Sequence, residues 1–129
     1  MFKSLSCSGL GALFAISAAL IPSVGHTQAY PSKPIRIVVP FAAGGPSDIT
    51  SRNIAPRMTE LLGAPIVVDN RGGASGMIGA EIVAKAPADG YTLLGGTASV
   101  TSINMVVFAK RPYETLRDLQ PLKIGRAHV

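Results

Sequence analysis

The sequence IRIVVPFAAGGPSD, residues 35–48, is the stretch that decides the fold. It begins with a β-branched run typical of a strand, passes through two glycines, and opens into a segment with the apolar spacing of a helix. Glycine allows backbone to approach a ligand closely, and the first amides of a helix have no acceptor within the helix. The helix dipole adds partial positive charge there. The stretch therefore predicts a strand–turn–helix junction suited to a carboxylate or phosphate.

The helix after this junction is expected to begin at Ser47 or Asp48 as N-cap and to end at Gly63. Its spacing predicts an inward face, and Pro56 should kink or divide the helix. The side chains predicted to face inward are Ile54, Met58, Leu61 and Leu62.

A second glycine loop, NRGGASGMIG, occupies residues 70–79. It follows a predicted strand at residues 66–68 and precedes a helix predicted over 76–86, with Ile78, Ile82 and Val83 facing inward. A third strand is predicted at residues 91–94. A loop with a short helix should follow over 97–107, and an extended segment should begin at Pro112-Tyr113.

Alternating strands and helices at this spacing predict an α/β fold, a βαβαβ unit with parallel strands and right-handed crossovers. In such sheets ligands bind at the carboxyl ends of the strands. Residues 41–48, 72–76 and 97–102 should therefore converge on one edge of the sheet.

The two ends of the chain read differently from its centre. Residues 1–29 have the pattern of a signal peptide, with Lys3 at the charged start, an apolar stretch and a small-residue cleavage site that makes Tyr30 the mature start. An uncleaved membrane anchor is the alternative. Residues 123–129 resemble translated sequencing-library adapter and are interpreted as a non-native tail, with a natural tail as the alternative.

Charge and composition exclude several classes of function. The formal charge of +5 falls to +2 over residues 30–122, which hold nine basic and seven acidic residues. No basic face with stacking aromatics is present, so nucleic acid is not an expected partner. The two histidines and the one cysteine lie in the end segments, which excludes catalytic triads and Cys/His zinc sites. We predict no catalytic residue, metal or cofactor.

The sequence offers weak signals for two further kinds of site, a carboxylate pair and a nucleotide site. A carboxylate pair is conceivable, yet Asp48, Asp69 and Asp89 have simpler roles as a cap, a strand end and a turn residue. The first loop lacks the Gly-Lys-Ser/Thr ending of a phosphate-binding loop, and residues 74–79 match the dinucleotide fingerprint only with alanine in first place. Ordinary tight turns remain the alternative explanation of the glycines.

Three motifs together make the chain recognisable. They are residues 30–41 with Gly44, Gly45 and Asp48; residues 67–71 with the glycine loop after them; and residues 84–94. They resemble the substrate-binding receptors of tripartite tricarboxylate transporters, the Bug receptors. The resemblance implies a periplasmic-binding-protein-like, two-domain α/β receptor that closes around a small carboxylate and delivers it to membrane subunits. It implies a monomer when full length, with residues 30–122 as the N-terminal part of the substrate-binding domain.

The resemblance also assigns ligand-binding residues. They are Phe41, Gly44, Gly45, Ser47 and Asp48 in the first loop, Gly73, Ala74, Ser75 and Gly76 in the second, and Thr97 and Ser99 after the third strand. Pro46 stands where the family usually has a third glycine, and it cannot donate an amide. Ser47 and Gly72 stand where threonine and proline are usual.

The sequence is also compatible with two other classes of function. One is a secreted α/β enzyme that uses carboxylate chemistry, against which the lack of histidine and cysteine counts. The other is a nucleotide-binding module, which the export signal disfavours.

Overall fold

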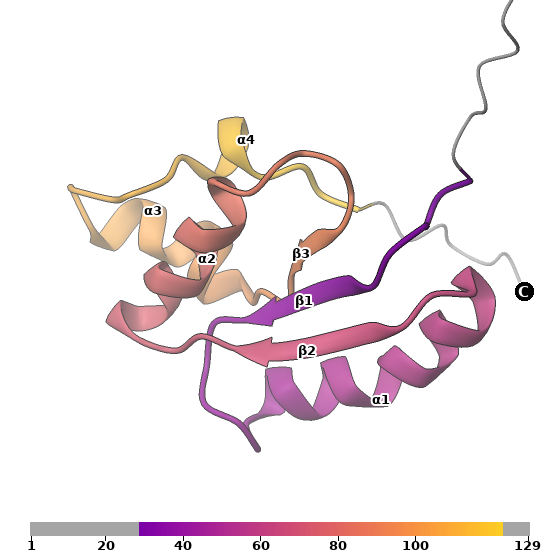
Figure 1. Cartoon of the computed structure of the whole chain (residues 1–129). Helices are drawn as coiled ribbons and strands as arrows, with labels where there is room; N and C mark the ends of the chain where they lie inside the picture. The colour runs from indigo at the N-terminus through magenta and orange to yellow at the C-terminus, as the bar shows by residue number, and fades with distance from the viewer. Residues whose placement is uncertain (1–28, 123–129) are drawn as a thin grey trace, which may run out of the picture.

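A computed structural model describes residues 29–122, and its centre is a parallel three-stranded sheet (Figure 1). The strands are β1 (Ile35–Val39), β2 (Ile66–Asn70) and β3 (Thr92–Leu94), in the order β2-β1-β3. Ile35 pairs with Ile66, and Arg36 pairs with Thr92. The predicted βαβαβ unit with parallel strands is confirmed.

Strand β1 is the centre of the core. Ile35, Ile37, Val38 and Val39 are buried, because helices cover both faces of the sheet. Helix α1 (Pro46–Leu62) lies along one face and α2 (Met77–Ala84) covers the other (Figure 1). The chain moves from β1 outward to β2 and then back across β1 to β3. The order therefore reverses between β1 and β3, which is where open α/β sheets bind ligands.

The predicted C-terminal end of α1 is correct, but the predicted N-terminal end is not. Gly63 closes the helix in the left-handed conformation, with φ of 67°, as predicted. The N-cap is Gly45, so the prediction of Ser47 or Asp48 is wrong: Pro46 takes the first helical position, where its fixed φ fits. Pro56 lies inside one continuous helix and does not divide it.

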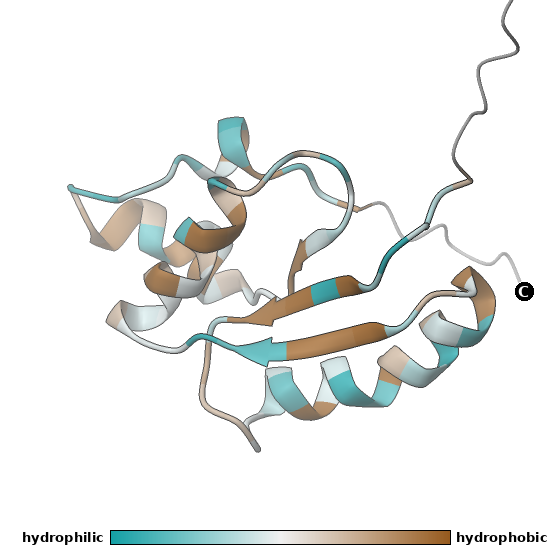
Figure 2. Cartoon of the chain, viewed as in Figure 1, coloured by the Kyte–Doolittle hydropathy of each residue, from teal (hydrophilic) through white to brown (hydrophobic). Residues whose placement is uncertain are grey.

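The predicted inward face of α1 is also wrong. Ile54 is 47% exposed and Leu61 69% exposed, whereas Asp48, Ser51 and Ala55 are buried. Short side chains of α1 face the sheet because the helix and the sheet approach each other closely. A methyl group built on Gly95 would lie 3.0 Å from the Ser51 hydroxyl oxygen. Figure 2 shows that β1 is apolar except for one hydrophilic segment, and that β2 ends in polar residues.

Helix α2 is shorter than predicted and is preceded by the 3-10 turn η1 (Ala74–Gly76). Ile78 was expected to face inward but is 46% exposed. Its side chain instead covers Gly73, where an added methyl group would lie 2.6 Å from the Ile78 Cδ1. Ile82 and Val83 are half-buried.

Beyond β3 the chain forms the π-helix η2 (Ser99–Ile103), α3 (Asn104–Val107) and α4 (Thr115–Asp118). The short helix expected within 97–107 is present, whereas the extended segment expected from Pro112 is soon interrupted by α4. Tyr113 turns inward and forms a second core with Ala80 and Val100. Its hydroxyl donates to the Val100 carbonyl at 2.7 Å. No helix in the described part of the chain is long and apolar enough to cross a membrane.

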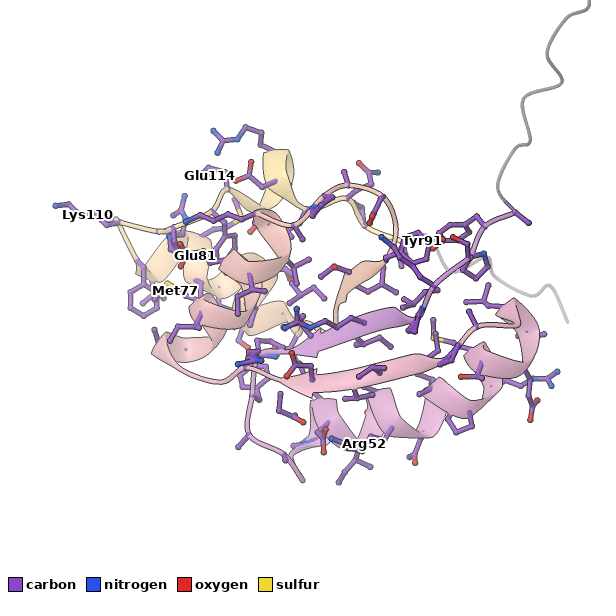
Figure 3. All side chains as sticks on the ribbon, in the orientation of Figure 1. Arg52, Met77, Glu81, Tyr91, Lys110 and Glu114 are labelled. Atoms are coloured by element: carbon purple, nitrogen blue, oxygen red, sulfur yellow. The ribbon has the colours of Figure 1, made fainter. Side chains whose placement is uncertain are left out.

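The lead-in to β1 is fastened to the turn before β3 by what we call the tyrosine clasp, formed by Tyr30, Lys33, Asp89 and Tyr91. The Tyr30 hydroxyl donates to the Gly90 carbonyl at 2.8 Å, and the two tyrosine rings meet edge to face at 5.0 Å. The Lys33 ammonium lies 3.1 Å from Asp89 and 4.3 Å above the Tyr91 ring. Figure 3 shows Tyr91 beside the segment that leads into β1. The clasp therefore joins the amino ends of β1 and β3.

Candidate functional site

The loops that follow β1 and β3 border a shallow depression at the carboxyl edge of the sheet. The depression has a volume of about 320 Å³, and its lining residues are Phe41, Pro46, Ser47, Thr97 and Ser99. None of these side chains carries a charge. The depression lies where the strand order reverses, as expected for a ligand site in an open α/β sheet.

The second loop, residues 71–76, packs against the first, residues 40–45. A methyl group on Gly72 would lie 3.5 Å from the amide nitrogen of Ala42. One on Gly76 would lie 3.4 Å from the Pro40 carbonyl oxygen and 2.6 Å from the Val100 side chain. The convergence of the three loops, predicted from parallel topology, is confirmed.

Three side chains fasten the first loop to the end of β2, and we call them the loop brace: Asp48, Arg52 and Asn70. The Asp48 carboxylate accepts hydrogen bonds from the Gly44 amide at 2.8 Å and from Arg52 Nε at 2.9 Å. Arg52 also donates to Asn70 Oδ1 at 3.0 Å, and Asn70 donates to the Phe41 carbonyl at 3.2 Å. Figure 3 shows Arg52 on the half of α1 nearest the end of β2. Both ends of the first loop are therefore held.

The brace changes the acidity of its carboxylate. Hydrogen bonds from Arg52 and from the Gly44 amide lower the pKa of Asp48 from 3.8 to about 2. Asp48 is therefore ionised at any ordinary pH. Its charge is compensated within the chain by Arg52 and the Gly44 amide.

The lowered pKa gives a pH prediction. Because the folded protein holds Asp48 ionised more strongly than the unfolded chain does, the stabilisation is fully present above about pH 4 and is lost as the pH falls through about 2. We expect the urea midpoint of the wild type to exceed that of Asp48→Asn at pH 6, and the gap to narrow between pH 4 and pH 2. A difference in urea midpoint that stays constant between pH 4 and pH 2 would contradict the lowered pKa of Asp48.

Asp69 and Asp89 are also paired with basic side chains. Burial disfavours ionisation of Asp69, but hydrogen bonds from Arg36 and Arg71 outweigh it and hold the pKa of the carboxyl below its ordinary value. The Tyr91 amide and Lys33 lower the pKa of Asp89. No group of three His, Cys, Asp or Glu side chains within residues 29–122 could hold a metal ion.

The amides of the first loop are partly used within the chain. The Gly44 amide donates to Asp48, and the Gly45 amide donates to the Ala42 carbonyl at 3.3 Å. The amides of Ser47 and Asp48 lie in the first turn of α1, where a helix offers no internal acceptor. The amide donors that this part of the chain can offer a ligand are therefore those of Ser47 and Asp48, at the start of α1.

The second loop has an uncommon backbone. Four successive residues have positive φ: Gly73 at 128°, Ala74 at 47°, Ser75 at 55° and Gly76 at 84°. The left-handed conformation costs a non-glycine residue about 1–2 kcal/mol. The Gly76 amide donates to the Gly73 carbonyl at 2.9 Å, whereas within residues 29–122 the amides of Ala74 and Ser75 have no acceptor. The turn therefore offers two successive amide donors, an arrangement that binds anions.

The third loop contributes hydroxyls. Thr97 Oγ1 and Ser99 Oγ lie 2.6 Å apart and share a hydrogen bond. The Thr97 carbonyl accepts the amides of Val100 and Thr101 at 3.0 and 3.1 Å, which fixes the start of η2. The pair is thus held at the rim of the depression, where it can donate to or accept from a polar ligand.

The structure separates the residues expected from the resemblance into two groups. Those that line the depression are Phe41, Ser47, Thr97 and Ser99; those in the adjoining loops or the brace are Gly44, Gly45, Asp48, Gly73, Ala74, Ser75 and Gly76. Sequence reasoning missed Arg52 and Asn104. The spacing of Asp48 and Arg52 at i and i+4 was a usable signal for the first, and the sequence carried none for the second.

Comparisons with known proteins place the chain in a family. Residues 50–127 match the model of the tripartite tricarboxylate transporter family receptor. The chain is 39% identical over 110 residues to protein BugT of Bordetella pertussis (strain Tohama I), covering 84% of the chain and 34% of BugT. It is 40% identical over 116 residues to the UPF0065 protein in the tcbD-tcbE intergenic region of Pseudomonas sp. (strain P51), covering 88% and 34%. The chain spans about a third of the length of these relatives.

Solved structures are similar too. A periplasmic transporter superposes with a TM-score of 0.71 at 48% identity, covering 74% of this chain and 32% of the other. MatC from Rhodopseudomonas palustris with bound malate gives 0.67 at 38% identity, covering 69% and 30%. An R. palustris protein with adipate gives 0.64 at 42% identity, covering 67% and 29%.

Proposed function

Since the chain belongs to the tripartite tricarboxylate transporter receptor family, we propose that it is the first part of a periplasmic solute-binding receptor for a small carboxylate. Residues 1–29 are its export signal, and Tyr30 is the mature start. Residues 30–122 form the N-terminal part of the substrate-binding domain, and residues 123–129 are not native to it. The whole protein is a monomeric receptor, not an enzyme, and passes its ligand to the membrane subunits of the transporter.

The observation that carries the proposal is the second loop beside an uncharged depression. Ala74 and Ser75 offer two successive amides without an acceptor in residues 29–122. Hydrogen bonds from such donors to an ionised acceptor are roughly twice as strong as neutral ones. The N-terminus of α1 adds favourable partial charge. A carboxylate can therefore be held without a basic side chain.

Dicarboxylates are the ligand class that the site supports best. Two similar proteins hold malate and adipate in their structures. In this chain, one carboxylate binds the amides of Ala74 and Ser75 and the Ser75 hydroxyl. Ser47, Thr97 and Ser99 supply hydroxyls to the rest of the molecule across the depression.

The enzyme alternative has no observation in its favour. Asp48, Asp69 and Asp89, the carboxylates weighed for acid–base chemistry, each form an ion pair with a basic side chain. A paired carboxylate with a lowered pKa is a poor general acid or base at neutral pH.

Ser75→Ala tests the site. A hydrogen bond to a charged group is worth about 1.5–3 kcal/mol, so removing the hydroxyl should weaken dicarboxylate binding roughly tenfold or more. The measurement is titration calorimetry of the protein expressed from its natural gene, with malate, adipate, acetate and citrate. Ser32→Ala, at the opposite end of the sheet, is the matched control and should bind as the wild type does.

The possible outcomes test the proposed function and the proposed binding site separately. A wild-type protein that binds none of these carboxylates would disprove the proposed function. Equal affinity of wild type and Ser75→Ala would leave the function standing and disprove the assignment of the second loop.

A further inference from the structure

Asn104 connects the third loop region to the second loop. It is the first residue of α3 and is only 3% exposed. Its Nδ2 donates to the Ser75 carbonyl at 3.0 Å, across 29 residues of sequence. A buried polar side chain is costly unless it is hydrogen-bonded, so this contact explains why an amide is tolerated there.

The carbonyl that Asn104 holds belongs to the most strained part of the backbone. Ala74 and Ser75 are the two non-glycine residues with positive φ within residues 29–122. A turn of this kind persists only when its surroundings over-determine it. The Ser75 carbonyl is fixed by Asn104, and the next residue, Gly76, is packed between Pro40 and Val100.

We propose that Asn104 is a positioning residue for ligand capture. By holding the Ser75 carbonyl it keeps Ala74 and Ser75 left-handed, so their amides are ready for a carboxylate before it arrives. It also fixes the distance between the second loop and the hydroxyls of Thr97 and Ser99, because η2 begins at Ser99 and ends directly before Asn104. This inference rests on the proposed function, since it concerns the same site.

Asn104→Leu is the decisive variant, because it keeps the branched shape of the side chain and removes the donor. One lost hydrogen bond corresponds to a roughly three- to tenfold weaker affinity. We expect that loss with malate or adipate, whichever the wild-type protein binds. Asn53→Leu, on the exposed side of α1, is the matched control and should leave affinity unchanged.

A rescue experiment distinguishes positioning from general packing. Ala74→Gly removes the cost of a left-handed residue without touching the Ser75 hydroxyl. In the Asn104→Leu background it should restore part of the affinity, whereas in the wild type it should change little. Absence of rescue would show that Asn104 acts through packing and would overturn the proposal.

A second measurement does not depend on ligand. In protein labelled with ¹⁵N-alanine and ¹⁵N-serine, the amide resonances of Ala74 and Ser75 should shift or broaden in Asn104→Leu and stay in place in Asn53→Leu. If Asn104→Leu does not fold, Asn104→Ala is measured in its place. Unchanged resonances would overturn the proposal, and a wild-type protein that binds neither acid would overturn only the proposed function.

Discussion

Gly79→Val is expected to destabilise the protein by about 3 kcal/mol. A methyl group at Gly79 would already lie 2.8 Å from the Arg71 carbonyl oxygen and 2.8 Å from Pro40 Cα. Both are backbone atoms that directly follow strands, so they cannot yield unless the first and second loops move. At Gly79, α2 packs directly on the backbone that follows β1 and β2, a close packing of helix and strand that is the role of the last glycine in the dinucleotide fingerprint.

Urea unfolding of the protein expressed from its natural gene measures this effect. Gly72→Ala is the control, since an added methyl group there would meet its neighbours at an ordinary 3.5 Å. The control should stay within about 1 kcal/mol of the wild type. If Gly79→Val proved as stable as Gly72→Ala, the close crossing of α2 would be wrong.

Tyr113→Ala should cost about 3–5 kcal/mol. The ring is 2% exposed and fills the core beside Ala80 and Val100. Tyr113→Phe keeps the ring and removes the hydrogen bond to the Val100 carbonyl, so it should cost about 0.5–1.5 kcal/mol. Packing and hydrogen bonding at this position are thereby measured separately.

The same urea experiment checks both variants. If alanine and phenylalanine gave the same loss, the ring would not be packed as described. Because Val100 lies in η2 next to Ser99, Tyr113→Ala should also loosen the third loop and weaken carboxylate binding. Tyr113→Phe should bind almost as the wild type does.

The sheet could be predicted from the sequence because its signal is local. Residues 35–39 are apolar except for Arg36, as expected for a strand covered on both faces, and the glycine loops mark where strands end. Once the strands are parallel, their carboxyl ends must share an edge. The meeting of the first, second and third loops then follows without any knowledge of side-chain contacts.

The inward face of α1 could not be predicted in the same way. Ile54, Met58, Leu61 and Leu62 have the right period, but so do the buried residues Asp48, Ser51 and Ala55. Hydrophobicity favours the first set. The close approach of α1 to Gly95 and the hydrogen bond from the Gly44 amide to Asp48 require the second, and both are set by tertiary packing.

The backbone of the second loop also lay beyond sequence reasoning. Neither alanine nor serine favours positive φ, so Ala74 and Ser75 are placed by contacts from distant parts of the chain. Asn104 is 29 residues from its partner Ser75, and Tyr113 is 13 residues from Val100. Such contacts leave no periodic signal.

The tyrosine clasp and the depression lie at opposite ends of β1. Tyr30, Lys33, Asp89 and Tyr91, which belong to the motifs that make the chain recognisable, sit at the amino ends of the strands. The five residues of β1, about 3.3 Å each, lie between them and the depression. Two relatives could share every atom of the clasp and still select different acids.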